Sequence, residues 1–411
     1  MPSLNQAAFI AEAVESVLLH QGETPLELIV ADGGSSDGTQ QMLSALVQRF
    51  GADRLRWFSE PDAGPADAVN RAFALARSDV IGWLNSDDLY TPGAVGHGVR
   101  LLLTHPDWLL VYGEGEHIGP TGSRLGRYPT LPPSAGIAAF QTGCYICQPT
   151  AFLRREAFES IGGLDTSLAT AFDFEFWLRL FRRWPGRVGH THRMQAKSRL
   201  HPGGITARQR QRVQAEGVTV LARHLGHAHP DWLRGWRDEL LAGFADGSLG
   251  GEPSPRSRLL SLLDELAGCF SRDDVSMLRA EFADDMRLTL ADAGVAANIG
   301  FDAWAPQRLD LLLQREPVAG AALSLRGEAG RALSGPLYLR VAADWGLRFA
   351  ERVDGPGPFT LVLPCPPSAA GRLGRITVTC DRAFSPVGLV PGSTDTRRLA
   401  WRLLAAEWLA P

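Results

Sequence analysis

The stretch "DVIGWLNSDDLY" (residues 79–90) joins a run of apolar residues to two adjacent carboxylates, Asp87 and Asp88. The apolar part predicts a buried strand. Like charges side by side repel unless a cation lies beside them, so a strand seldom ends in this way. Two carboxylates at a strand end form a hard-oxygen site suited to Mg²⁺ or Mn²⁺. In the alternative interpretation one acid caps the next turn and the other is solvated, which explains one acid better than two.

The chain on either side of this stretch alternates between helical and strand-like patterns. Apolar residues at helical spacing predict helices, and short β-prone runs predict strands. The helices are expected over residues 8–20, 38–50, 65–77 and 93–104, and the strands over 26–31, 54–58, 79–84 and 108–113. This alternation indicates an α/β fold with a mostly parallel sheet flanked by helices. Ligands of such sheets bind beyond the carboxyl ends of the strands, where Asp32, Asp87 and Asp88 are all expected.

Composition changes divide the rest of the chain. Further helices are predicted over 173–184, 206–225 and 231–244, which places a first domain at residues 1–246. The Gly/Pro/Ser-rich stretch "GSLGGEPSPRS" opens a linker and helical connector over 247–300. Residues 301–411 contain short strand-like runs separated by Gly and Pro, the pattern of a C-terminal all-β sandwich.

The overall composition limits the possible classes of function. The chain has 411 residues, 45% of them hydrophobic, and a net charge of -4, which argues against broad nucleic-acid binding. It has no run of 18 apolar residues, so no integral membrane span is expected, and the basic run "RQRQR" (208–212) predicts a solvated helix face rather than a peripheral membrane contact. Five cysteines indicate no disulfide framework, so the expected location is cytoplasmic. The lone CxxC pair, Cys144 and Cys147, lacks the second pair of ligands that a zinc site needs.

Several polar residues lie in segments typical of ligand binding. Asp32 lies in the turn "ADGG", where it either bonds its own backbone or accepts hydrogen bonds from a nucleotide base or ribose. "SEPDAGPADAVN" adds Asp62, Asp67 and Asn70, and Asp67 also suits a helix N-terminus.

A second group of candidates lies farther along the chain. In "TAFDFEFWLRL", Asp173 and Glu175 lie among aromatic residues. An acid in such a place either caps the helix or is held in a low-dielectric cleft as a general base. His201, in "RLHPGGIT", is a structural residue unless a metal lies nearby. The histidines at 190 and 192 and at 224, 227 and 229 have no acid at ligand spacing and are predicted to be surface residues.

Five segments together resemble glycosyltransferase family 2, whose members have the GT-A fold. They are "PSLNQAAFIAEAVESVLLHQ…LELIVADGGSSDGT", "SEPDAGPADAVNRAFALARSDVIGWLNSDDLY", "QPTAFLRREAFESIGGLD", "AFDFEFWLRL" and "RLHPGGIT". They cover about residues 2–205, in the family's order. The resemblance is specific for fold and reaction class, and it says little about the sugar.

The resemblance implies a role for each matching residue. Asp32 would contact the nucleoside, although Gly33 stands where the family often has a second acid. In the metal motif "NSDD", Asp88 would be the ligand, and Asp87 would contact the ribose or the metal.

The same resemblance extends to the reacting groups. Asp173 would be the catalytic base, although Phe172 replaces the preceding acid of the family's motif. His201 would approach the metal or the diphosphate.

The implied function is transfer of a sugar, with inversion, from a nucleotide-diphosphate donor to an acceptor hydroxyl, dependent on Mn²⁺ or Mg²⁺. The acceptor would be a glycan, a lipid-linked saccharide or a protein, in polysaccharide or glycan assembly at the inner face of the cytoplasmic membrane. Two alternatives remain open. One is a non-catalytic carbohydrate-binding or scaffolding protein on a decayed transferase fold, and the other is a nucleotidyltransferase.

The start of the chain departs from the family pattern. Family members begin with an apolar strand before "PSLN", and here Met1 stands where that strand would end. An absent central strand would leave backbone edges unpaired. The expectation is that translation starts upstream and that this first strand is missing from the sequence as given.

Overall fold

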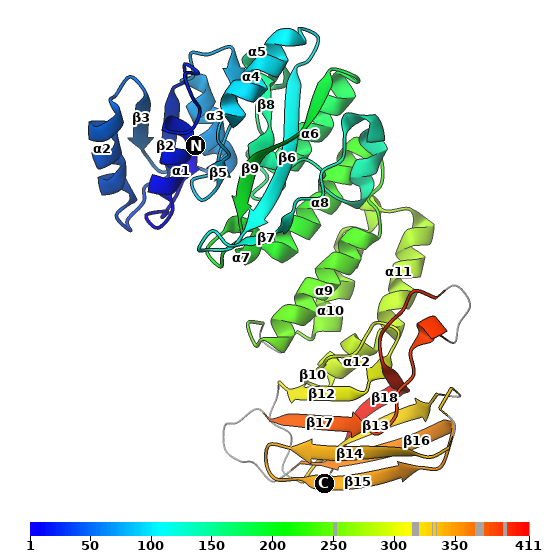
Figure 1. The fold of residues 1–411 in the computed structure, drawn as a ribbon. Coiled ribbons are helices and arrows are strands. Elements are labelled where there is room, and N and C mark those ends of the chain that lie inside the picture. Colours follow the sequence, from blue (N-terminus) through cyan, green and yellow to red (C-terminus); the bar gives the residue numbers. More distant parts are fainter. Residues whose placement is uncertain are drawn as a thin grey trace. The chain divides into compact units, whose positions relative to one another are not determined.

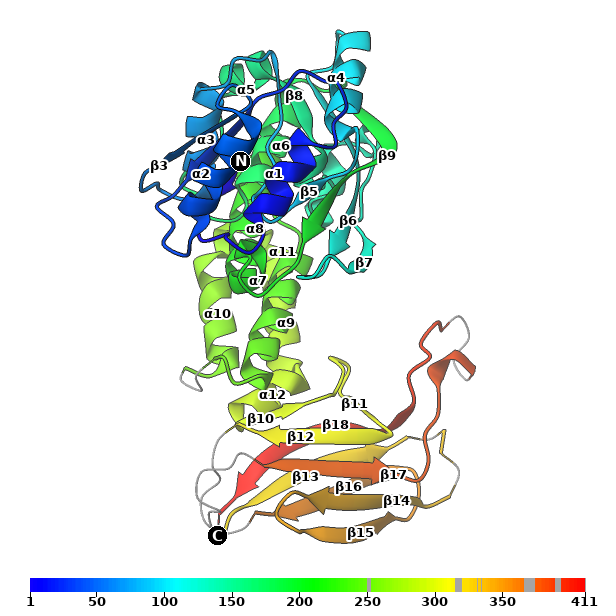
Figure 2. The same cartoon turned by 60° about the vertical axis from the view of Figure 1, so that its left-hand side comes forward.

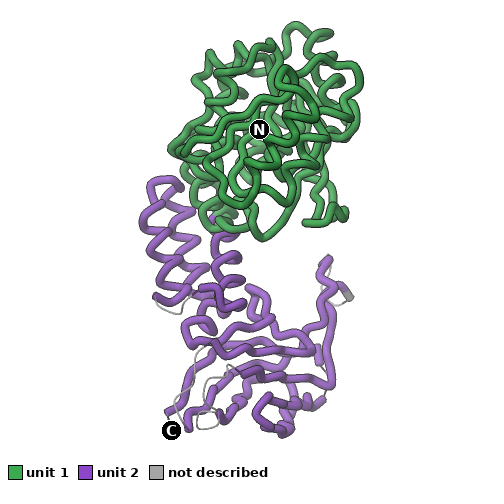
Figure 3. Tube along the Cα trace, turned by 90° about the vertical axis from the view of Figure 1, so that its left-hand side faces the viewer, with its two compact units in different colours: residues 1–232 green, residues 233–411 purple. Residues whose placement is uncertain are grey.

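The computed structural model describes residues 1–249, 253–314, 320–330, 332–333, 335–365, 374–388 and 393–410. The chain forms two compact units, Met1–Trp232 and Leu233–Pro411 (Figure 3). The domain boundaries expected from composition, at residues 246 and 300, stay predictions. Among the described residues, no helix combines the length and the apolar character needed to cross a membrane.

Unit 1 begins with a parallel three-stranded sheet in the order β1-β2-β3 (Figure 1). Its elements are β1 (Pro2–Ser3), α1 (Ile10–Leu18), β2 (Leu28–Asp32), α2 (Thr39–Phe50), β3 (Leu55–Ser59) and α3 (Pro65–Ala74). Side chains of a strand alternate between faces. Leu28 and Val30 of β2 therefore pack with α1 and α2, whereas Ile29 and Ala31 pack against α3.

A second sheet of unit 1 has the order β4-β8-β6-β9-β5, with β7 paired to β6. Its strands are β4 (Val80–Ile81), β5 (Leu89–Tyr90), β6 (Leu110–Ile118), β7 (Arg124–Arg127), β8 (Phe152–Arg154) and β9 (Val188–Arg199). Pairing is parallel between β6 and β9 and antiparallel elsewhere. The α/β class is confirmed, with parallel pairing throughout the first sheet and between β6 and β9 of the second.

Helices and short turns complete unit 1. They are α4 (Ala94–Thr104), η1 (Pro133–Ala135), η2 (Ile137–Thr142), η3 (Gln148–Thr150), α5 (Arg155–Ile161), α6 (Phe172–Arg183), α7 (Ile205–Arg208) and α8 (Arg210–Leu225). The strand expected over 79–84 is shorter, because the chain leaves the ladder after Ile81. The Trp83 ring stacks on Trp177 of α6 at 5.5 Å, and the Trp83 carbonyl accepts a hydrogen bond from the Gln148 side chain. These contacts fix the segment that leads to Asp87.

The N-terminal residues form part of the first sheet. Pro2 and Ser3 pair with Ala31 and Asp32, and the buried Met1 amine donates to the Ile29 carbonyl at 2.8 Å. Burial lowers the pKa of this amine to about 5. An apolar cavity of about 300 Å³ lies beside it, lined by residues of β2, α3 and β4 among others. The first strand is thus represented by two residues, and the expectation of an upstream start stays a prediction.

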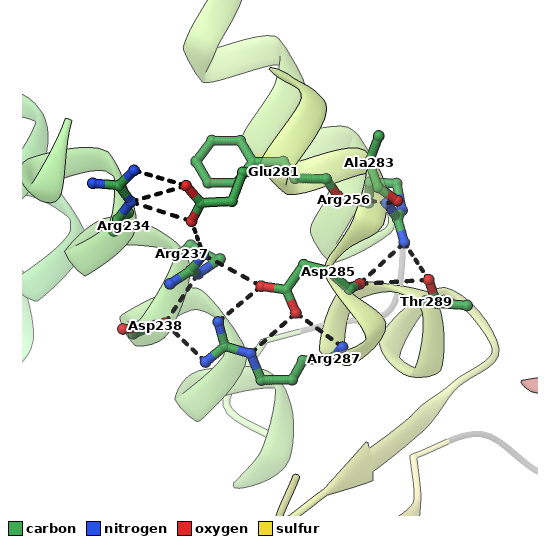
Figure 4. A network of polar contacts seen from close by, with 10 residues as sticks. Arg234, Arg237, Asp238, Arg256, Glu281, Ala283, Asp285, Arg287 and Thr289 are labelled. Atoms are coloured by element: carbon green, nitrogen blue, oxygen red, sulfur yellow. Dashed lines mark hydrogen bonds and ion pairs between the residues drawn. The ribbon is translucent and has the colours of Figure 1, made fainter. Parts of the chain in front are cut away.

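The helices of unit 2 are joined by a network of charged groups (Figure 4). The helices are α9 (Asp231–Ala245), whose first two residues lie in unit 1, α10 (Pro255–Glu265), η4 (Ala267–Cys269), α11 (Arg272–Asp284) and α12 (Met286–Asp292). Arg237 lies at the centre, with its guanidinium 2.8 Å from Glu281, 3.0 Å from Asp238 and 3.3 Å from Asp285. Arg287 also contacts Asp285, at 2.8 Å. The network therefore links α9, α11 and the start of α12.

The rest of unit 2 is a sandwich of two antiparallel sheets, as Figures 1 and 2 show. One has the order β10-β12-β17-β14-β15 and the other β11-β18-β13-β16. The strands are β10 (Val295–Ala297), β11 (Trp304–Pro306), β12 (Arg308–Leu313), β13 (Ala322–Ala329), β14 (Leu337–Ala343), β15 (Arg348–Val353), β16 (Gly357–Pro364), β17 (Arg375–Cys380) and β18 (Leu399–Leu409), with the turn η5 (Pro386–Gly388) before β18. Alternate residues of both sheets, Leu309, Leu325 and Trp401 among them, share one core. The expected β-sandwich is confirmed.

Replacing Arg237 with alanine is expected to lower the free energy of unfolding of unit 2 by about 3 kcal/mol. Removing one partner of a buried ion pair leaves the other charge poorly compensated, and both Arg237 and Asp285 are almost fully buried. The matched control is Arg279→Ala, because Arg279 and its partner Asp264 are half exposed and such pairs contribute below about 1 kcal/mol. Denaturant titrations followed by circular dichroism measure both. Equal effects of the two variants would contradict the prediction.

Candidate active site

The centre of the candidate site is the pair Asp87 and His201. Asp87 precedes β5 and His201 follows β9, and these strands pair antiparallel with Leu89 opposite Lys197. Continuing this register places Asp87 opposite Arg199, two residues before His201. His201 Nε2 lies 3.0 Å from Asp87 Oδ2, and both side chains are largely buried. The expected neighbourhood of Asp87 and His201, 114 residues apart in sequence, is present in the structure.

Asp88 has different surroundings from Asp87. The backbone N–H of Arg199 donates to Asp88 Oδ1 at 2.8 Å, and the Asn85 side chain donates to Asp88 Oδ2 at 3.2 Å. Asp88 is 3% exposed, and burial, followed by the neighbouring Asp87 charge, raises the pKa of its carboxyl well above the usual value. Of the two acids, Asp87 has the carboxylate oxygen that faces an imidazole, and Asp88 is held by the backbone of β9.

Arg199 organises both acids and was not singled out by the sequence analysis. Its Nε donates to the Asp87 carbonyl at 2.8 Å, and its Nη2 contacts Glu12 of α1 at 2.7 Å. The guanidinium lies over the Phe9 ring, which also contacts the His201 ring at 4.6 Å between centroids. The only hint in the sequence was its place two residues before His201, and an arginine at a strand end is too common to be informative.

Asp173 lies in the first turn of α6. The Phe174 N–H donates to its Oδ1 at 2.7 Å, and burial raises the pKa of Asp173 to about 6 in spite of this hydrogen bond. The negative charges of Asp88 and Asp173 both raise the pKa of the buried Cys147 thiol, after burial itself. An acid with a pKa near neutrality is suited to accept a proton.

Glu175, the alternative base, is part of a buried ion pair. Its carboxylate accepts hydrogen bonds from Arg179 at 2.8 Å and contacts His224 Nε2 at 2.9 Å. Burial raises its pKa, but the hydrogen bonds from His224 and Arg179 lower it below the usual value overall. His224 is therefore not the surface residue that the sequence predicted, because Glu175 supplies the missing acid. Glu175 has a structural role in joining α6 to α8.

Asp32 is held by its own turn, as one of the two interpretations of the sequence proposed. Its Oδ2 accepts hydrogen bonds from the Ser59 hydroxyl at 2.6 Å and from the Ser35 N–H at 3.0 Å. Ser35 also donates its hydroxyl to Oδ1. Asp32 is 1% exposed. These contacts position the turn after β2, and direct contact of Asp32 with a nucleoside stays a prediction.

Asp62 lies where a side chain at position 33 would be. A Cβ atom on Gly33 would lie 2.7 Å from Asp62 Oδ2, so a larger residue at position 33 would displace this carboxylate. Burial raises the pKa of Asp62. Position 33 has no acid, but the Asp62 carboxylate, from the segment after β3, occupies the space beside it.

Asp67 and Asn70 have partners that account for them structurally. Asp67 accepts a hydrogen bond from the Ala63 N–H at 3.2 Å. Asn70 donates to the Leu164 carbonyl and accepts from the Leu164 N–H, both at 2.9 Å. Asn70 therefore joins α3 to the segment after α5, and its expected contact with a ligand stays a prediction.

The two cysteines of the CxxC pair are buried or partly buried thiols. Burial raises the pKa of Cys144 to about 12 and that of Cys147 well above the usual value. The interpretation that they are not zinc ligands stays a prediction.

Residues 1–162, which include Asp32, Asp87 and Asp88, match the model of the family described as glycosyl transferase family 2. The match lies within unit 1 and covers 162 of the 411 residues. An uncharacterized glycosyltransferase of Rickettsia felis is 28% identical over 217 residues, which are 49% of this chain and 33% of that protein. The chondroitin synthase of Pasteurella multocida is 27% identical over 202 residues, 49% of this chain and 20% of that protein. The chain thus matches a third or less of the length of these two relatives.

Two solved structures of transferases match this chain at lower sequence identity. TarS of S. aureus in complex with UDP-GlcNAc is 13% identical and covers 71% of this chain and 86% of that chain, with a TM-score of 0.48. A mannosyltransferase from Pyrobaculum calidifontis in complex with GDP-Man and Mn²⁺ is 18% identical and covers 69% of this chain and 78% of that chain, with a TM-score of 0.43.

Proposed function

We propose that this protein is a metal-dependent, inverting glycosyltransferase that moves a sugar from a nucleotide-diphosphate donor to an acceptor hydroxyl. The observation that carries the proposal is the contact of Asp87 with His201, together with the buried Asp173, in a unit that matches the glycosyl transferase family 2 model. Two relatives are named as synthases of chondroitin and hyaluronan, so the proposed process is the assembly of a polysaccharide or related glycan.

The residues present fit a divalent cation. Asp87 Oδ2 and His201 Nε2 are 3.0 Å apart, about the separation of neighbouring ligands of an octahedral ion with bonds of about 2.1 Å. Mn²⁺ accepts carboxylate and imidazole ligands, whereas Mg²⁺ prefers oxygen, so the pair favours Mn²⁺. Asp87 and His201 would hold the ion, and Asp88 would keep their strands in register. When bound, such an ion offsets the charge that develops on the departing diphosphate.

Asp62 is the proposed contact to the donor's nucleoside. Its carboxylate takes the space above Gly33, next to the turn that Asp32 holds. A ribose or base approaching the end of β2 would meet this carboxylate before the fully buried Asp32. Asp32 would then influence nucleoside binding indirectly, by holding the turn after β2 in place.

Asp173 is the proposed general base. Direct displacement at the anomeric carbon requires the acceptor hydroxyl to lose its proton as it attacks, and a positioned carboxylate accepts it. Inversion follows from a single displacement. The raised pKa of Asp173 makes it a stronger base than an exposed aspartate, and the ion pair of Glu175 leaves that neighbour unsuited to the task.

A nucleotide-sugar donor is expected to raise the melting temperature of the protein only together with Mn²⁺. A ligand that binds the native state alone stabilises it by about 2.7 kcal/mol at 100 times its Kd. A thermal-shift screen of UDP-, GDP- and dTDP-sugars, with Mn²⁺ and with chelator, identifies the donor class.

Product analysis of the stabilising donor then separates the three functions. Release of a nucleoside diphosphate indicates glycosyl transfer, and release of pyrophosphate in the presence of a nucleoside triphosphate and a sugar phosphate indicates nucleotidyl transfer. Binding of saccharides without either product indicates a non-catalytic carbohydrate-binding protein. Either of the last two results would overturn the proposal.

A further inference from the structure

A second group of potential metal ligands lies between the middle of β6 and the start of β9. Glu114 projects from β6, and His190 and His192 project from β9. One ligand atom from each residue lies within 4.8 Å of the other two. The sequence predicted His190 and His192 as surface residues without an acidic companion, and the structure corrects this for His190, whose side chain is 8% exposed.

An irregularity of the strand pair brings the three residues together. Where β6 advances one residue, from Gly113 to Glu114, its partner in β9 advances from Thr191 to Met194. His192 therefore lies in a bulge of β9, and a bulge redirects side chains that a regular ladder would separate. Gly113 permits the close crossing, because a Cβ atom there would lie 2.8 Å from the Arg193 carbonyl oxygen. The two strands lie side by side in Figure 1.

The distance from Glu114 to His190 matches the ligand separation of a tetrahedral ion, and the distance to His192 is slightly longer. His190 Nε2 lies 3.3 Å and His192 Nδ1 lies 3.7 Å from the same oxygen, Glu114 Oε1. Ligands of a tetrahedral zinc ion with bonds of about 2.0–2.1 Å are about 3.3–3.4 Å apart. Two imidazoles and one carboxylate are a ligand set that zinc sites with an open fourth position use.

The surroundings of His190 add support. Its Nε2 is buried and makes no hydrogen bond of regular geometry among the described residues, although Glu114 Oε1 lies 3.3 Å away. A buried polar atom in a native structure normally has a partner, and an ion is one explanation when it does not.

We propose that Glu114, His190 and His192 form a Zn²⁺ site distinct from the pair of Asp87 and His201. Imidazole nitrogen suits zinc, and the exposed His192 ring leaves an open path for the ion and for water at the fourth position. The ion would fasten the bulge of β9 to β6. Because β9 ends at Arg199, which holds Asp87 and Asp88, the site would stiffen the strand that carries this part of the active site.

The test is the stoichiometry of Zn²⁺ binding to the full chain in an Asp87→Asn background, which weakens the other candidate metal site. Calorimetric titration with ZnCl₂ is expected to show one site per chain. Adding His192→Ala or Glu114→Gln is expected to weaken binding by about 100-fold or more, since loss of a group that merely supports a ligand already costs about 10–100-fold. Co²⁺ in place of Zn²⁺ is expected to give the visible absorption of a tetrahedral complex in the background protein and not in the two site variants.

Matched controls use residues outside the site. His20→Ala removes an exposed histidine, and Glu116→Gln neutralises the next acid of β6 with the same side-chain direction, so both are expected to retain the site. His192 is exposed and Glu114→Gln keeps the shape, so neither change endangers the fold. Absence of a site in the background protein, or undiminished binding in both site variants, would overturn the proposal.

Discussion

Replacing Asp87 with asparagine is expected to abolish metal-dependent donor binding and to lower sugar transfer by about 10³-fold or more. Asparagine keeps the shape of the side chain and removes the charge that faces His201. A bound divalent ion contributes several kcal/mol of charge stabilisation to a reaction of this type, and about 1.4 kcal/mol corresponds to a tenfold change in rate. Donor binding by calorimetry at fixed Mn²⁺ and turnover by release of nucleoside diphosphate are the two measurements.

Asp88→Asn is the matched variant. Its carboxylate accepts a hydrogen bond from the backbone N–H of Arg199, and the amide oxygen of asparagine can accept the same bond. We therefore expect a smaller loss of activity than for Asp87→Asn, with Mn²⁺ affinity mostly kept. The opposite order would assign the ion to Asp88, as the family resemblance implied. Full activity of the parent protein in excess chelator would remove the metal from the proposal altogether.

The fold was largely predictable because its local patterns agree with its tertiary contacts. Apolar residues such as Ile10, Val14 and Val17 recur at helical spacing and are buried in α1. The strand 79–84 was predicted too long, because Trp83 is buried by stacking on Trp177 and not by a sheet. An apolar run shows that residues are buried and does not show which element buries them.

The candidate site was predictable where chemistry and strand ends coincide, and not where it depends on distant pairing. The acids at 87, 88 and 173 could be found from the sequence. The different environments of Asp87 and Asp88 follow from the register of β5 on β9, which joins segments more than 100 residues apart in sequence. Arg199 and the group around Glu114 depend on the same long-range pairing, and a bulge leaves no mark in composition or periodicity.

Asp173→Asn is expected to lower turnover by about 10²–10⁴-fold, the usual contribution of a positioned general base, while Kd for donor and Mn²⁺ stays near the parent value. A loss confined to turnover is the signature of an interaction made mainly in the transition state. Glu175→Gln is the matched control two residues along α6. It weakens the buried ion pair with Arg179, so it is expected to lower stability with a smaller effect on turnover. The reverse result would transfer the role of base to Glu175.

The pH dependence gives an independent test of the same assignment. Burial raises the pKa of Asp173 to about 6, so the base is protonated below that pH, and turnover is expected to rise with pH and to level off above about 7. Stability has the opposite trend. Between about pH 4 and 6 the folded state binds a proton that the unfolded state has lost, so the contribution of this group to stability falls as pH rises through that window. Asp173→Asn is therefore expected to raise the melting temperature at pH values above 6. The remaining turnover of this variant is expected to lack the increase with pH near 6 that the parent protein shows. A variant that is less stable than the parent at pH 7 and keeps the parent's pH–rate profile would contradict both the buried charge and its role as the base.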